Sequence, residues 1–141
     1  MDRDSHHSEV GASATRRLII TRLSLVLLAG LYFAHTAAGA LQPSAPRSGI
    51  TLVLGWGFTF LVFGAVVFVA SRLPRKAPTI ATFLLLVFLA MQALATFAVF
   101  MHFSSTPLPL SVVVIDILFV LDLVVSFVLV TQHLLDHARH Q

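Results

Sequence analysis

The sequence predicts an all-α membrane protein with four transmembrane helices and with both termini in the cytoplasm. Hydrophobic residues make up 57% of the 141 residues and charged residues only 11%, whereas a typical soluble domain has about 25% charged residues. The apolar residues are gathered in four blocks. Each block has about 20 residues or more, which at about 1.5 Å rise per residue is enough to cross a hydrocarbon core of about 30 Å.

The N-terminal segment, residues 1–15, is polar and has no hydrophobic period, so we expect a disordered tail. His6 and His7 in this tail could bind a metal ion, but a solvated tail explains them without one. We therefore place the four-helix bundle at residues 16–131 and assign no metal site.

The first predicted span covers about residues 18–40. Two arginines precede it and small residues at 38–40 resemble a cleavage site, so a cleaved secretory signal is an alternative. Arg22, Tyr32 and His35 lie inside the block and favour an uncleaved first helix.

The second predicted span covers about residues 50–71, with Trp56 in its first third, as is typical of an aromatic residue at the membrane interface. Three glycines in this span remove side chains from the helix surface and predict a close approach by another helix, namely Gly55, Gly57 and Gly64.

The third and fourth spans cover about residues 78–101 and 108–131. Pro78 suits the first turn of a helix, where its missing N–H costs nothing. Residues 132–141 form a polar, helical, cytoplasmic tail in this interpretation.

Basic residues set the predicted orientation. They gather before the first span, between the second and third spans and after the fourth, whereas the other two connections hold only Arg47. The segments rich in Lys and Arg stay in the cytoplasm, so we predict a protein of the cell membrane with both ends inside. The lipid bilayer is then its first partner, and no basic stripe with interleaved aromatic residues indicates nucleic acid.

Asp116 and Asp122 lie within the fourth span, where a charged Asp costs about 2.5–3.5 kcal/mol, so both are candidate functional residues. Counted from the middle of each span, Asp116 and Gln92 lie about 5 and about 4 Å toward the outside. Asp122 and Arg22 lie about 4 and about 8 Å toward the cytoplasm. The two acids are about 240° apart around the helix, and Ser126 lies one turn from Asp122 on the same face.

These depths predict partners for the polar groups. We expect the first helix to pack on the fourth, with the Arg22 guanidinium paired with Asp122 rather than reaching the headgroups. A protonated Asp116 bonded to Gln92 would satisfy the second acid.

The sequence gives little support for a cofactor site or a catalytic site. A haem held between His35 and His102 requires two ligands at one level, but their depths differ by about 8 Å. His133, His137 and Asp136 could hold a metal through an i, i+4 pair, although a solvated helix end explains them equally. We predict no cofactor and no enzyme activity, since no nucleophile, base and acid can be assembled from the sequence.

Two main function classes remain, with a third that has little support. The first is a protein that acts by association, as a homo-oligomer or as an accessory subunit of a membrane complex. The alternative is a small proton-coupled transporter that uses an intramembrane Asp, and a b-type haem redox subunit is a distant third. The layout resembles that of small multidrug resistance transporters, but their essential acid lies in the first helix, where this chain has Arg22 and no acid. A polar cavity that reaches an Asp would favour transport.

Overall fold

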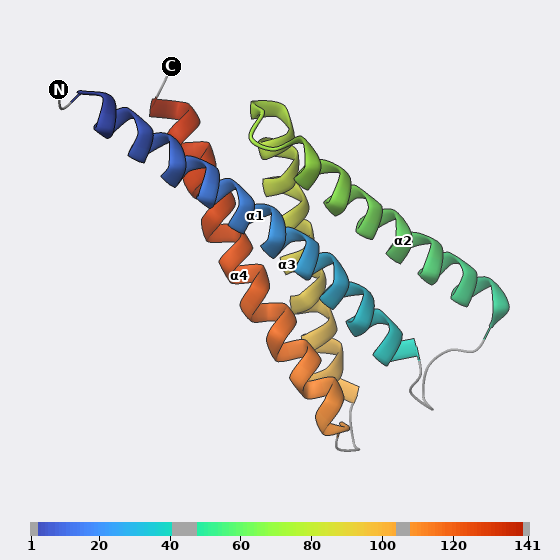
Figure 1. Cartoon of the computed structure of the whole chain (residues 1–141). Coiled ribbons are helices and arrows are strands. Elements are labelled where there is room, and N and C mark those ends of the chain that lie inside the picture. Colours follow the sequence, from blue (N-terminus) through green and yellow to red (C-terminus); the bar gives the residue numbers. More distant parts are fainter. Residues whose placement is uncertain (1–2, 41–47, 104–107, 140–141) are drawn as a thin grey trace.

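The chain folds into four α-helices. The computed structural model describes residues 3–40, 48–103 and 108–139, and their side chains within 11–40, 48–98 and 108–139. Each helix contains a stretch that is long and apolar enough to cross a membrane, which confirms the prediction of four helices of spanning length. The helices are α1 (Arg3–Ala40), α2 (Gly49–Arg72), α3 (Lys76–Phe103) and α4 (Leu110–Arg139) (Figure 1).

The first helix is longer than expected. It begins at Arg3, although the composition of residues 1–15 predicts a disordered tail. The starts of the second and third helices agree closely with the predicted spans. α2 begins at Gly49, directly after Ser48 as its N-cap, and α3 begins at Lys76, two residues before Pro78.

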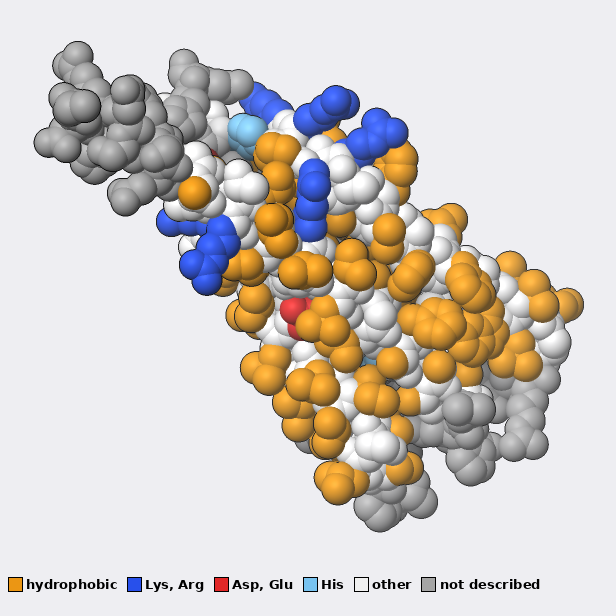
Figure 2. Space-filling model, in the orientation of Figure 1, with side chains coloured by type: hydrophobic (Ala, Val, Ile, Leu, Met, Phe, Trp, Pro, Cys, Tyr) orange, Lys and Arg blue, Asp and Glu red, His pale blue; other side chains and the backbone are white. Residues whose placement is uncertain are grey.

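Both termini lie at one end of the bundle, together with the corner between α2 and α3 (Figure 1). Lys and Arg side chains gather at this end (Figure 2), which we call the basic end. Its described members are Arg16, Arg17, Arg22, Arg72, Arg75, Lys76 and Arg139.

Each helix packs on two others. α1 contacts α2 and α4, and α3 contacts the same two helices, so the predicted packing of the first helix on the fourth is confirmed. Buried residues recur every three or four positions, as in Leu25, Leu28 and Tyr32 of α1 or Phe119 and Leu123 of α4, which is the spacing of one helix face.

Large apolar side chains also cover the outer faces of the helices (Figure 2). Leu23, Leu61, Leu84 and Leu121 are each about three-fifths exposed. Such a surface suits the hydrocarbon of a bilayer, where no water has to be excluded.

Buried threonines are satisfied by their own helices. The hydroxyls of Thr59, Thr79 and Thr82 donate to the carbonyl oxygens of Gly55, Arg75 and Pro78, four residues earlier. These side chains therefore need no partner on a neighbouring helix.

The predicted close approach at the glycines of α2 is wrong. A Cβ atom added to Gly55, Gly57 or Gly64 would meet no atom within 4 Å. At Gly55 the space belongs to a cavity.

Candidate functional site: a cavity between the helices that reaches Asp116

A cavity of about 560 Å³ lies in the half of the bundle away from the basic end. Away from the basic end, α2 diverges from α3 and α4 (Figure 1). Pockets that hold small molecules have about 300–1,000 Å³, so the space suits one organic ligand. All four helices contribute to its wall. The lining residues are Tyr32, His35, Thr36 and Gly39 of α1, Gly55, Phe58 and Thr59 of α2, Gln92, Ala93, Thr96 and Phe97 of α3, Leu108 just before α4, and Val112, Asp116, Phe119 and Val120 of α4.

The most polar group of the cavity is the pair formed by His35 and Asp116. Nδ1 of His35 lies 2.6 Å from Oδ1 of Asp116, slightly closer than the about 2.7–2.9 Å of charge-assisted N–H···O hydrogen bonds. The imidazole ring stacks on Phe119, with 5.7 Å between ring centroids and an interplanar angle of 9°. The side chains of His35 and Asp116 keep 22% and 37% of their surface exposed, so both stay accessible from the cavity.

A second polar contact crosses the bundle beside this pair. The Tyr32 hydroxyl donates to Oε1 of Gln92 at 3.2 Å and thereby links α1 to α3. Both residues line the cavity. The predicted bond between Asp116 and Gln92 is therefore wrong, because each of the two side chains bonds to a different residue of α1.

Asp122 belongs to a separate cluster between α1 and α4. The Ser24 hydroxyl donates to Oδ1 of Asp122 at 2.9 Å and lies 2.8 Å from the Ser126 hydroxyl. A hydroxyl has one proton to donate, so Ser126 donates to Ser24 and reaches the acid only through it. Oδ2 of Asp122 is buried and has no hydrogen-bond partner among the described residues.

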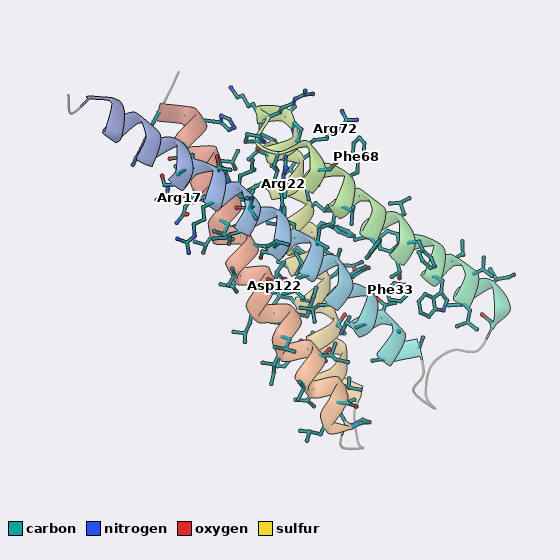
Figure 3. The ribbon with its side chains drawn as sticks, in the orientation of Figure 1. Arg17, Arg22, Phe33, Phe68, Arg72 and Asp122 are labelled. Atoms are coloured by element: carbon teal, nitrogen blue, oxygen red, sulfur yellow. The ribbon has the colours of Figure 1, made fainter. Side chains whose placement is uncertain are left out.

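The predicted ion pair between Arg22 and Asp122 is wrong. Nη2 of Arg22 donates to the carbonyl oxygens of Leu73 at 2.5 Å and Ser71 at 3.4 Å. Figure 3 shows Arg22 near the corner between α2 and α3, away from Asp122. The last carbonyls of a helix lack intrahelical donors and carry partial negative charge, so the end of α2 competes successfully for the guanidinium.

The two tail histidines also hold the basic end together. Nε2 of His133 lies 3.2 Å from the Thr21 hydroxyl, and Nε2 of His137 donates to the Pro74 carbonyl oxygen at 2.5 Å. The described residues contain no group of three side chains that could hold a metal ion. The side chains of His6, His7 and His102, on which two other predictions rested, lie outside the described side chains.

The sequence analysis did not predict two of these contacts, that of Ser24 with Asp122 and that of His35 with Asp116. The estimated depths of the residues in the membrane could have indicated both. Ser24 lies near the depth of Asp122, and His35 lies within one helical turn of the depth of Asp116.

The bundle is thus joined by polar contacts at the basic end and hollow at the other. No protein-family model, no curated protein and no solved structure matches this chain. The cavity and its acid therefore carry the functional argument.

Proposed function

We propose that the protein is a small proton-coupled carrier of the cell membrane. The observation that carries this proposal is that Asp116, within a helix of spanning length, lines a cavity of about 560 Å³. An ionisable group inside a membrane is expensive and is usually kept for binding or transport. Of the two function classes that the sequence leaves open, this feature favours transport.

In this proposal the His35–Asp116 pair exchanges a proton when the cavity fills or empties. Nδ1 of His35 and Oδ1 of Asp116 lie 2.6 Å apart, close enough for one proton to be shared between them. The basic end faces the cytoplasm by the positive-inside rule, so the cavity lies in the outer half of the membrane in this proposal. The α1, α2 and α4 contacts of Arg22, His133 and His137 then close the cytoplasmic side.

Transport is tested in liposomes that contain the purified protein and a pH-sensitive dye. Candidate substrates should release protons across the bilayer, and Asp116→Asn should abolish the signal because an amide cannot exchange a proton. Asp122 does not line the cavity, so Asp122→Asn should leave the exchange intact. Loss of exchange in Asp122→Asn alone would contradict the assignment of the site to Asp116.

Association is a second candidate, favoured by the buried Oδ2 atom of Asp122 that lacks a partner. The apolar surface around α1 and α4 contains acidic atoms (Figure 2), and a second membrane helix packed on this surface would cover them. Light scattering of the detergent-solubilised protein separates the cases. A strictly monomeric protein that purifies alone would remove association, whereas an oligomer dispersed by Asp122→Asn would support it. Neither candidate involves enzyme chemistry.

A further inference from the structure

We infer that the ligand of the cavity is an uncharged aromatic compound that carries a hydroxyl group, that is, a lipophilic phenol. The inference rests on the proposed carrier function for the movement of this ligand, and it names the substrate class of the same site.

The hydroxyl groups of the described cavity wall offer acceptors rather than donors. Thr36, Thr59 and Thr96, on three different helices, each donate to the carbonyl oxygen four residues earlier in their own helix. The Tyr32 hydroxyl donates to Oε1 of Gln92. A hydroxyl has one proton to donate, so these four groups can only accept a hydrogen bond from a ligand. Thr36 and Thr96 are the accessible ones, because Thr59 and Tyr32 are only 1% and 5% exposed.

Asp116 adds a further acceptor to the wall. Its Oδ1 lies 2.6 Å from Nδ1 of His35, and a contact this short holds one proton between the two atoms, whichever of them carries it. No described residue donates to Oδ2 of Asp116. The side chain keeps 37% of its surface exposed, so Oδ2 can receive a hydrogen bond from a ligand in the cavity.

Gln92 provides the complementary donor. Its Oε1 accepts from Tyr32, and no described residue accepts from the two N–H bonds of its side-chain amide. Nε2 of His35 can take either role, depending on where its proton lies. A phenol hydroxyl both accepts and donates, so it can accept from Gln92 and donate to Asp116. An ether or a carbonyl group only accepts and would leave Asp116 without a donor, which is unfavourable for a polar group cut off from water.

The rest of the wall suits an aromatic body. Four aromatic rings line the cavity, one from each helix, namely those of Tyr32, Phe58, Phe97 and Phe119. Aromatic rings pack favourably on one another edge to face or in offset stacks. Phe58 and Phe97 are 42% and 61% exposed, so much of each ring is left for contact with a ligand.

The wall favours an uncharged ligand over a charged one. No Lys or Arg is among the described lining residues, so an anion would lie near Asp116 without a compensating charge. A cation would find a single acid, one oxygen of which is already held by His35. Bringing a charge into a membrane interior costs more than bringing in a hydroxyl group. A phenol therefore reaches the free oxygen of Asp116 at the lower cost.

The experiment measures binding by equilibrium dialysis to the full chain in nanodiscs of zwitterionic lipid, with the uptake by empty nanodiscs subtracted. The probes are para-phenylphenol and para-methoxybiphenyl, which share two aromatic rings and differ only in the methyl group that replaces the hydroxyl proton. We expect the phenol to bind saturably. The ether should bind at least tenfold more weakly, because a site that hydrogen-bonds a hydroxyl group rejects the analogue that lacks it.

Asp116→Leu should bring the two affinities together, because leucine is of similar size and cannot accept the hydroxyl proton. Asp136→Leu makes the same change in the exposed tail of α4 and should keep the preference for the phenol. Gel filtration checks that both variants remain folded, and the comparison of the two probes on the unaltered protein decides the matter if Asp116→Leu does not fold. Equal binding of both probes, no saturable binding of the phenol, or an unchanged preference in folded Asp116→Leu would each overturn the inference.

The outcomes also separate this inference from the carrier proposal. Saturable binding that requires the hydroxyl group, without proton exchange in liposomes, would leave the phenol site standing and remove the carrier. Exchange that depends on Asp116 and is driven by a compound without a hydroxyl group, in a protein that does not bind para-phenylphenol, would do the reverse.

Discussion

The guanidinium of Arg22 lies 2.5 Å from the carbonyl oxygen of Leu73, the C-cap of α2, and so joins the middle of α1 to the end of α2. This contact replaces an ion pair with a hydrogen bond to a helix end. A hydrogen bond that involves a charged group contributes about 1.5–3 kcal/mol.

Arg22→Ala should therefore lower the free energy of unfolding by about 1.5–3 kcal/mol, because the end of α2 loses its donor. Thermal unfolding in detergent measures the effect, and Arg22→Lys should recover part of it. Arg16→Ala removes an exposed arginine from the same helix and is the control. Equal destabilisation by both alanine variants would contradict the role of the Leu73 contact.

Filling the cavity should block ligand binding without unfolding the protein. A side chain at Gly55 would extend from a wall residue with no atom within 4 Å of its Cβ, so Gly55→Phe should reduce substrate-driven proton exchange in liposomes at least tenfold. Gly57→Phe adds the same ring to the same helix at a position that does not line the cavity. If Gly57→Phe impaired binding as strongly as Gly55→Phe, the cavity would not be the binding site.

The direction of the hydrogen-bond chain at Asp122 predicts an order of effects. Ser24→Ala leaves both the acid and Ser126 without their partner, which should cost about 1–3 kcal/mol. Ser126→Ala removes only the donor to Ser24 and should cost about 0.5–1.5 kcal/mol. Unfolding of the two variants in one detergent gives the comparison. A larger loss in Ser126→Ala would show that Ser126, rather than Ser24, supports the acid.

His137 should protect the corner between α2 and α3 from proteolysis. Its imidazole donates to the Pro74 carbonyl oxygen, so His137→Ala should free the segment that contains Arg72, Arg75 and Lys76. Trypsin cleavage there, followed by mass spectrometry, should become several-fold faster. Gln132→Ala changes an exposed residue on the same helix and should leave the rate unchanged, while equal rates in all three proteins would rule out this role.

The helices could be predicted from the sequence because the length of an apolar run determines whether it can form a transmembrane helix. The span predicted at 50–71 corresponds to α2 at Gly49–Arg72, and four blocks of this kind leave few alternative folds. The pairing of α1 with α4 could also be predicted, since both helices carry the strongest polar groups.

The hydrogen-bond partners of the polar side chains could not be predicted in the same way. Counting residues gives depth along the membrane normal but not the rotation of a helix about its axis. Arg22 has both Asp122 and the end of α2 within reach, and only the rotation of α1 decides between them. The cavity also could not be predicted from the sequence. It depends on the divergence of α2 from α3 and α4 and not on any local sequence pattern (Figure 1).

The polar contacts between α1 and α4 occur at three levels, His35 with Asp116, Ser24 with Asp122, and Thr21 with His133. Sliding one helix past the other by a single turn, about 5.4 Å, would separate all three pairs at once. We therefore expect α1 and α4 to keep a fixed register and to move as one rigid body. If the cavity opens alternately to the two sides of the membrane, the movement must then come from α2 and α3. These helices would pivot about the corner where Arg22 and His137 hold them.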